Sequence, residues 1–218
     1  MSHRTKDPYR DQRGDNCGRI TNQVGTTQSD LTLRRLARDE EAEFLRAYRA
    51  TSPGFPAFAH YYDERMPFRR YLEVLAERER GINLPPGHVA STLLFAFVDK
   101  RIVGRTSIRH RLTDDLARTG GHIGYAIVPE FRRRGYATTI LRMSLQIARE
   151  LYGIHRVLVT CDDDNVASIR TIEKNGGVLE NVIEGPDVAR PKRRYWIEND
   201  PLTRPNAPTT VTRANKMA

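Results

Sequence analysis

Residues 128–138 read VPEFRRRGYAT and join two segments with different periodicities. The preceding residues 122–128 (HIGYAIV) form a short apolar run typical of a strand, whereas residues 136–152 repeat apolar side chains at helical spacing. The turn therefore brings a glycine and three arginines to the start of a helix, where backbone N–H groups lack internal partners and carry partial positive charge. Because glycine also lets the backbone approach a ligand closely, the stretch predicts a phosphate-binding turn.

Strand-like and helix-like segments continue on both sides of this turn. Their order is β-α-α-β-β-β-α-β-α-β-β, which predicts an α/β (mixed α+β) fold with one central mixed, mostly antiparallel sheet flanked by helices. The expected strands are residues 31–36, 91–98, 102–110, 122–128, 156–161, 177–182 and 193–197, and the expected helices are residues 39–49, 67–80, 136–152 and 165–174. Residues 1–30 and 200–218 are polar without apolar periodicity, so we expect disordered tails around one domain at 31–199.

Composition narrows the class of protein. The chain has 218 residues, of which 39% are hydrophobic and 29% charged, as in an ordinary globular domain. Its apolar runs are only as long as strands, and no apolar segment follows the basic residues near the start, so we expect neither a membrane span nor a secretory signal. Cys17 and Cys161 lie in unlike contexts, and we find no spacing typical of metal ligands. A reduced, cytoplasmic protein without a metal is expected.

The net charge of +9 raises the alternative of nucleic-acid binding. Acidic stretches at residues 39–41 and 162–164 interrupt the arginines, and no zinc-finger, RRM or basic-helix pattern is present. An anionic small-molecule ligand explains the same charge, so nucleic acid is the less favoured partner.

The chain carries RRRGYA at residues 132–137, NVAS at residues 165–168 and EKNGG at residues 173–177. These motifs resemble those of the GNAT superfamily of acetyl-CoA-dependent N-acyltransferases. Residues 132–137 (RRRGYA) match its cofactor loop, Arg/Gln-x-x-Gly-x-Gly/Ala, and a strand ending in Val-Pro precedes them. Residues 165–168 (NVAS) and 173–177 (EKNGG) match a second block, Asn-x-x-Ser and Glu-Lys-x-Gly. The resemblance covers residues 31–199, and the pieces HIGYAI, RVLVTCDDDN, IEKNGGVLE and RRYWI are similar to a group of predicted acetyltransferases within the superfamily.

This resemblance implies acetyl-CoA as the cosubstrate and a set of contacts to it. Backbone N–H groups of residues 133–138 would cradle the pyrophosphate, and open backbone groups near Ile127 and Val128 would pair with the pantetheine arm. The N–H near Val128 would also hold the developing oxyanion, and Asn165 would contact the pantetheine unless it only caps its helix. The implied cofactor-binding residues are Ile127, Val128, Arg132, Arg133, Arg134, Gly135, Tyr136, Ala137, Thr138, Asn165 and Ser168.

The expected proton donor is missing from its usual place. Many relatives carry a tyrosine four residues before the glycine of the second block, and that position is Ile172 here. Tyr125, His122 and Tyr195 are the nearest replacements. Tyr125 and His122 differ by three positions and so face opposite sides of an extended strand. Tyr125 is the predicted catalytic acid, with a packed core tyrosine as the alternative.

Other conspicuous residues have two interpretations each. Residues 162–164 (DDD) could attract a cationic amine or lie at a helix start as solvated charge. The aromatic residues Phe55, Phe58, Tyr61 and Tyr62 could line an acceptor pocket or pack the core. Cys161 ends a buried strand and is interpreted as a small core residue.

The sequence thus predicts an N-acetyltransferase in which a primary amine, of a small molecule or a peptide, attacks acetyl-CoA directly in a ternary complex. The alternatives are an acyl-CoA-binding module without turnover and, less favoured, a basic nucleic-acid-binding protein. Pairing of the final strands across a homodimer is a further expectation.

Overall fold

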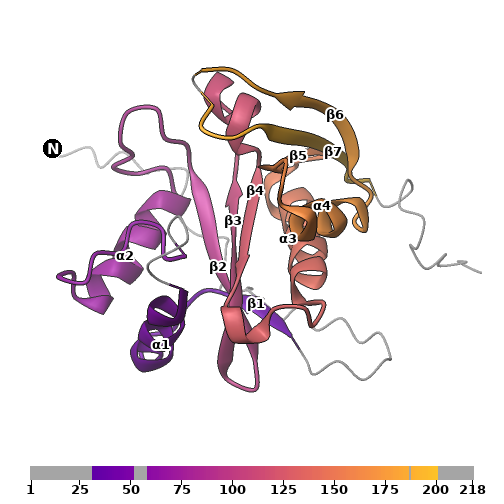
Figure 1. Ribbon diagram of the computed structural model, residues 1–218. Helices are drawn as coiled ribbons and strands as arrows, with labels where there is room; N and C mark the ends of the chain where they lie inside the picture. The colour runs from indigo at the N-terminus through magenta and orange to yellow at the C-terminus, as the bar shows by residue number, and fades with distance from the viewer. Residues whose placement is uncertain (1–30, 52–57, 187, 201–218) are drawn as a thin grey trace, which may run out of the picture.

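The computed structural model describes residues 31–51, 58–186 and 188–200 (Figure 1). The predicted tails therefore lie outside the described residues, apart from Asp200. The strands are β1 (Thr32–Arg34), β2 (Ser91–Val98), β3 (Arg101–Arg109), β4 (Ile123–Ile127), β5 (Arg156–Asp162), β6 (Val178–Ile183) and β7 (Lys192–Glu198), and the α-helices are α1 (Glu41–Thr51), α2 (Phe68–Glu79), α3 (Tyr136–Tyr152) and α4 (Val166–Glu173). Strands and α-helices follow one another in the predicted order, and the mixed α/β fold class is confirmed.

Two short helical turns were not predicted, namely η1 (Leu116–Gly120) and η2 (Pro129–Phe131). Each is too short for a periodic pattern to indicate it. The start of α1 also differs from the prediction. The helix was expected to begin at residue 39, but it begins at Glu41, and the Glu40 carboxylate accepts a hydrogen bond from the Ala37 N–H at 2.7 Å.

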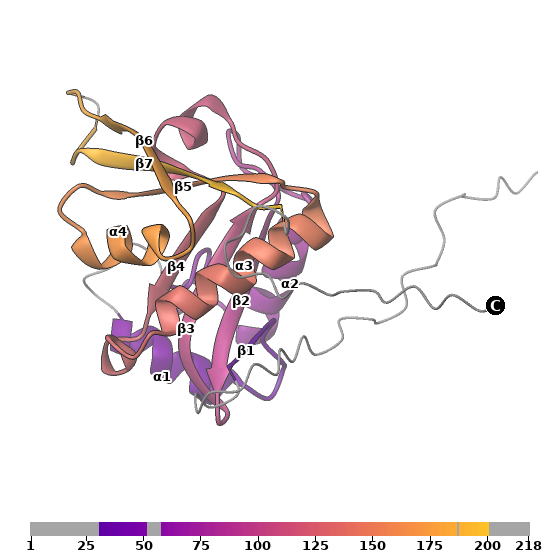
Figure 2. The same cartoon turned by 90° about the vertical axis from the view of Figure 1, so that its right-hand side faces the viewer.

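The strands form two hydrogen-bonded sheets instead of the single sheet expected. One sheet has the order β1-β2-β3-β4 and the other has the order β5-β7-β6, and every pair in them is antiparallel. The second sheet lies across the upper end of the first in Figure 2. The boundary between the sheets falls between β4 and β5, which is the place where the candidate site lies.

Helices cover both faces of the four-stranded sheet. Helices α1 and α2 lie on one face and α3 on the other (Figures 1 and 2). On the α1/α2 face, Phe95 packs with Phe44 and Tyr71, which are each fully buried. On the α3 face, Leu94 packs with Leu141 in a second core cluster that also includes β5 and β7. Neighbouring residues of a strand point to opposite faces, so Phe95 and Leu94 enter different cores.

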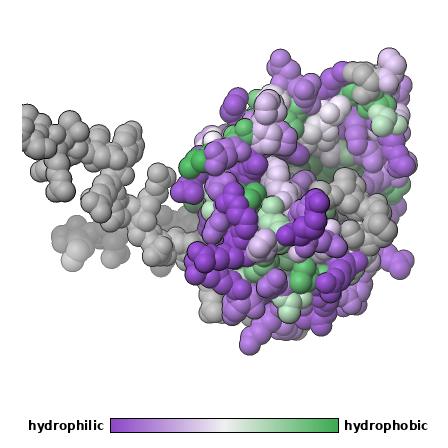
Figure 3. Space-filling view, turned by 90° about the vertical axis from the view of Figure 1, so that its left-hand side faces the viewer, coloured by the Kyte–Doolittle hydropathy of each residue, from purple (hydrophilic) through white to green (hydrophobic). Residues whose placement is uncertain are grey.

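The outer surface of the α1/α2 side is largely hydrophilic. Figure 3 shows hydrophobic residues there only as small patches separated by hydrophilic ones. Among the described residues, no helix combines the length and the apolar character that crossing a membrane would require.

Candidate active site

Two hydrogen bonds between His122, which directly precedes β4, and Leu158 of β5 join the two strands, and we call this pair of bonds the clip. The His122 N–H donates to the Leu158 carbonyl at 2.7 Å, and the Leu158 N–H donates to His122 Nδ1 at 3.0 Å. His122 is 8% exposed, and burial, with the nearby Arg109 charge, lowers its pKa to about 4. The ring must be neutral to accept the Leu158 bond, so its lowered pKa and its geometry agree. His122 was a candidate proton donor, but the structure commits it to holding the two sheets together.

Beyond this clip, no hydrogen-bonded ladder joins β4 to β5 in the described part of the chain. The direction of the β4 backbone groups follows from two bonds to β3. The His122 carbonyl accepts from the Arg109 N–H at 2.8 Å, and the Val128 N–H donates to the Val103 carbonyl at 3.0 Å. Alternate residues of a strand direct their backbone groups to opposite sides. Even-numbered residues of β4 therefore face β3, while the N–H and C=O groups of Tyr125 and Ile127 face the open edge.

This arrangement corrects one expectation about Val128. Its N–H was expected to hold the oxyanion, but that N–H is already bonded to β3, and the residue is fully buried. The open backbone group nearest the turn belongs to Ile127 instead. The sequence could not show this, because the direction of a backbone N–H depends on the register of β4 against β3, in which Ile127 lies opposite Gly104.

The turn after β4 has an unusual backbone. Arg133 has a φ of 60° and Gly135 a φ of 81°, while Arg132 between β4 and these residues has a φ of −65°. Such alternation turns successive N–H groups toward a shared concavity that suits an anion. Gly135 is the N-cap of α3 and provides no side-chain cap, and the first helical bond runs from the Thr139 N–H to the Gly135 carbonyl at 3.3 Å.

The N–H groups of Tyr136, Ala137 and Thr138 consequently precede the first helical bond, as the phosphate interpretation requires. The side chains of Arg132, Arg133 and Arg134 are exposed beside them. Arg132 Nε lies 3.4 Å from the Ile127 carbonyl, and the Arg134 guanidinium lies over the Phe131 ring, 5.5 Å from its centre. We call residues 132–138 the cradle. It fits a phosphate-bearing ligand, and the adjoining strand edge fits an amide-bearing chain.

Helix α4 lies next to the open edge of β4, on the side away from β3. Asn165 is its N-cap, and Oδ1 accepts a hydrogen bond from the Ser168 N–H at 3.0 Å, so the capping interpretation is confirmed. The Tyr125 hydroxyl lies 3.4 Å from the Ser168 carbonyl, and burial raises the Tyr125 pKa to about 12. Ile172, one turn further along α4, is fully buried in the core. Tyr125 thus reaches, from β4, the helix on which relatives carry their tyrosine.

Three other candidates have structural roles. Tyr195 is 1% exposed, and its hydroxyl lies 3.3 Å from the Glu173 carboxylate. Cys161 is buried, and burial raises the pKa of its thiol to about 11, in agreement with a core residue. The acidic stretch lies directly before the N-cap of α4, as the helix-start interpretation expected, and its carboxylates form ion pairs. Its ion-pair partners on or before β7 are Lys192 for Asp162, Arg193 for Asp163 and Arg190 for Asp164.

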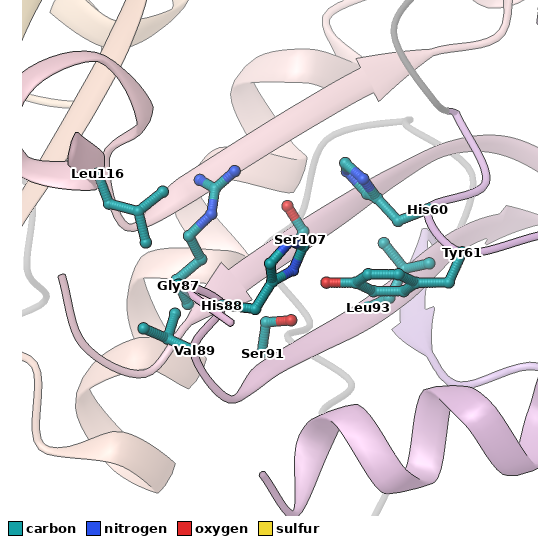
Figure 4. Close-up of a pocket in the computed structure, with 10 residues that line it drawn as sticks. His60, Tyr61, Gly87, His88, Val89, Ser91, Leu93, Ser107 and Leu116 are labelled. Atoms are coloured by element: carbon teal, nitrogen blue, oxygen red, sulfur yellow. The ribbon is translucent and has the colours of Figure 1, made fainter. Parts of the chain in front are cut away.

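A hollow opens on the α1/α2 face of the four-stranded sheet, and β2 and β3 contribute to its lining (Figure 4). We call it the acceptor-side pocket; its volume is about 220 Å³. Figure 4 shows His60, Tyr61, His88 and Ser107 around it. The lining residues are His60, Tyr61, Gly87, His88, Val89, Ser91, Leu93, Ser107, Arg109 and Leu116. Ser107 and Gly124 connect the pocket to β4, because Ser107 Oγ lies 3.5 Å from the Gly124 carbonyl.

Sequence reasoning found only Tyr61 among these lining residues. Of the other aromatic candidates, Phe58 is buried in the core, Tyr62 packs edge-on against Phe44 at 4.9 Å, and Phe55 lies outside the described residues. The pocket combines two loops, two strands and η1 from separate parts of the chain, so no local motif indicates it. The one feature of the local sequence that indicates the pocket is a charged residue, Arg109, at a strand position that faces the protein interior.

Arg109 lines this pocket, and the charge of Arg105, which lies two residues earlier on β3, also acts on His60. Arg105 is 4% exposed and donates to the Phe58 carbonyl at 3.1 Å and the Gly124 carbonyl at 3.2 Å. Burial lowers the Arg105 pKa to about 10 and also lowers the Arg109 pKa. The His60 pKa falls to about 3, mainly through burial and also through the charges of Arg105 and Arg109. The His60 ring is consequently neutral at physiological pH.

Comparison with known proteins identifies the family. The model of the acetyltransferase (GNAT) domain matches residues 30–178. An N-alpha-acetyltransferase from Saccharolobus solfataricus is 24% identical over 163 residues, which cover 72% of this chain and 85% of that protein.

Two solved structures show the same fold. One is yncA from Salmonella typhimurium with its cofactor acetyl-CoA, with a TM-score of 0.52, 16% identity and coverage of 81% of this chain and 98% of that one. The other is a chimera of the spermidine N-acetyltransferase SpeG from Vibrio cholerae with hSSAT, with a TM-score of 0.52, 15% identity and coverage of 78% of this chain and 95% of that one. The predicted resemblance is confirmed: the chain belongs to the GNAT family of acetyltransferases and is an acyltransferase that uses acetyl-CoA.

Proposed function

We propose that the protein transfers the acetyl group of acetyl-CoA to a primary amine of a small-molecule or peptide acceptor, by direct attack in a ternary complex. The observation that carries this proposal is the position of two separate binding regions along β4. The cradle begins at Arg132, after η2 at the end of β4, and the acceptor-side pocket adjoins the first half of β4 at Gly124. Two substrates can therefore be held at once, with the open backbone edge of β4 between them.

Bound acetyl-CoA would supply an activated acyl thioester. Its phosphates would lie against the N–H groups of Tyr136, Ala137 and Thr138, with the exposed arginines of the cradle screening their charge. The open N–H and C=O groups of Tyr125 and Ile127 would pair with its amide-bearing arm, and Asn165 and Ser168 would form the opposite wall. The Ile127 N–H takes over the oxyanion role that was first expected of Val128.

The acceptor amine must lose its proton before it attacks. No carboxylate is among the described residues that line the acceptor-side pocket. The nearby charge of the buried Arg105 disfavours an ammonium ion, so it lowers the pKa of a bound amine and increases its neutral fraction. The neutral His60 ring can accept a hydrogen bond from the amine or from a water that carries the proton away.

Tyr125 is the proposed donor to the leaving sulfur. Its pKa of about 12 keeps the hydroxyl protonated throughout the physiological range. A thiol has a pKa of about 8.5, so complete proton transfer from this tyrosine would be uphill. The hydroxyl therefore stabilises the thiolate by a hydrogen bond, and solvent supplies the final proton.

The test is acetyl transfer itself. Purified protein is incubated with acetyl-CoA and a panel of amines, thiol release is followed, and the acetylated product is identified by mass spectrometry. Acceptor-dependent thiol release with an N-acetylated product is expected. Tight acetyl-CoA binding without transfer to any amine would instead favour an acyl-CoA-binding module.

We also propose a homodimer formed through the β6 edge. This strand is at the end of its sheet, and its exposed apolar residues are Val178, Leu179 and Val182. An unpaired apolar edge favours strand pairing with a second copy. Light scattering should give twice the chain mass of 25.0 kDa, and Val182→Lys should shift the protein to a monomer. A wild-type monomer at all concentrations would refute this assembly.

A further inference from the structure

Arg109 has a distinctive position in the acceptor-side pocket. Its Nη1 donates to the Gly120 carbonyl at 3.1 Å and to the Gly121 carbonyl at 2.9 Å, which fixes one end of the guanidinium against the segment after η1. Within residues 31–51, 58–186 and 188–200, Arg109 forms no ion pair, and neither Nε nor Nη2 has a hydrogen-bond partner. The guanidinium is thus held in place with part of its donor fork available.

The described residues that line the pocket provide no negative charge. The polar side chains around Arg109 are the hydroxyls of Tyr61, Ser91 and Ser107 and the rings of His60 and His88. A second hollow on the molecule differs, because Glu41 and Glu64 line it together with Arg49 and Arg65. A half-buried cation without a carboxylate favours an anionic ligand, and the planar fork of arginine matches a carboxylate.

We propose that Arg109 binds a carboxylate of the acceptor, so that the enzyme acetylates amines that carry a carboxylate close to the amino group. This inference rests on the proposed function and specifies its substrate class. The pocket volume of about 220 Å³ suits a free amino acid or a single residue of a peptide. The same positive charge disfavours a polyamine, because a second ammonium would lie near Arg109 and Arg105.

The experiment compares three acceptors with one carbon skeleton: an amino acid, its carboxamide and the amine without the carboxyl group. Each is tested with the wild type, Arg109→Leu and Arg109→Lys. For the amino acid, kcat/KM should fall about 10- to 100-fold in Arg109→Leu, the range for a lost charge-assisted hydrogen bond, and should partly recover in Arg109→Lys. The kcat/KM values for the carboxamide and for the simple amine should change little in either variant.

The matched control is Arg49→Leu, which removes an arginine from the second hollow and should leave kcat/KM for all three acceptors unchanged.

Short peptides with Asp or Gly at the first position form a further arm, which distinguishes free amino acids from peptides as the source of the carboxylate. Thermal unfolding of each variant checks that the loss of the Gly120 and Gly121 bonds has not unfolded the protein. Arg109→Lys keeps the test valid if Arg109→Leu does not fold.

Failure of the inference and failure of the proposed function have different signatures. Equal rates for the amino acid and its carboxamide, or a preference for spermidine, would overturn the carboxylate assignment and leave acetyl transfer intact. If no amine is acetylated, calorimetry of the CoA-saturated protein with the amino acid decides the inference. Binding that Arg109→Leu weakens at least 10-fold supports it, and no binding refutes it.

Discussion

The cradle and the acceptor-side pocket lie along the same strand but are built in different ways. The cradle is one continuous stretch, residues 132–138, in which backbone N–H groups face outward and the arginine side chains are exposed. The pocket combines two loops, β2, β3 and η1, and its key side chain, Arg109, is held by carbonyls from another segment. A site for a cosubstrate shared by a whole family can be encoded locally. A site that selects the acceptor depends on tertiary structure.

The largest expected effect lies between the two regions, at Tyr125. Tyr125→Phe removes the hydrogen bond to the leaving sulfur, so kcat should fall about 10- to 100-fold, in line with a lost bond to a charged group. The dissociation constant of acetyl-CoA should stay unchanged. Tyr62→Phe, at another partly buried tyrosine, is the control and should keep its kcat. If Tyr125→Phe keeps the full kcat, Tyr125 is a packing residue only.

A substitution at Gly135 should damage the cradle and spare the pocket. Gly135 and Gly153 both have left-handed backbones at the two ends of α3, with φ of 81° and 65°. Valine at either position should cost about 1–2 kcal/mol of stability. Only Gly135→Val should also weaken acetyl-CoA binding, by about 10-fold, since the strain changes the backbone that faces the phosphates. Equal acetyl-CoA affinities in the two variants, measured by calorimetry, would contradict the cradle.

The charge of the arginines should contribute less to acetyl-CoA binding than the backbone geometry of the cradle does. Replacing Arg132, Arg133 and Arg134 together with glutamine should raise the acetyl-CoA dissociation constant about 5-fold at low salt, since each exposed contact contributes up to about 1 kcal/mol. The difference from wild type should shrink as salt screens the charges. Glutamine at the exposed Arg38, Arg80 and Arg111 is the control. A salt-independent difference would indicate that these arginines act by packing.

The smallest functional effect is expected at the His122 clip, which supports both regions. The folded-state pKa of about 4 is below the ordinary value of 6.5, so the unfolded chain binds more protons between these pH values. Stability should therefore be lost as pH falls from 6.5 toward 4. His122→Ala should remove part of this pH dependence and cost about 1–3 kcal/mol at pH 7, because the Leu158 N–H loses its acceptor.

The exposed His155 provides the matched control, and His155→Ala should leave the free energy of unfolding at pH 7 unchanged. Chemical denaturation across this pH range measures both quantities. An unaltered pH profile in His122→Ala would show that the clip does not titrate as proposed.

Local patterns predicted much of this molecule. Helix α3 has the predicted bounds of residues 136–152, and Asn165 caps α4 as one of its two interpretations required. The remaining features depend on contacts between distant segments. The division into two sheets follows from the lack of a ladder between β4 and β5 in the described residues, and the direction of the Val128 N–H follows from its bond to Val103. The pairing of residues 162–164 with basic residues near β7 is likewise a result of folding.

The central claim is that the cradle holds acetyl-CoA while the acceptor-side pocket independently holds the amine. Initial rates measured with both substrates varied, for wild type, Gly135→Val, Arg109→Leu and the double variant, test it most directly. We predict that Gly135→Val raises only the KM for acetyl-CoA and Arg109→Leu only the KM for the carboxylated acceptor, with free-energy effects that add within about 0.5 kcal/mol. Either variant raising both KM values equally would contradict the account.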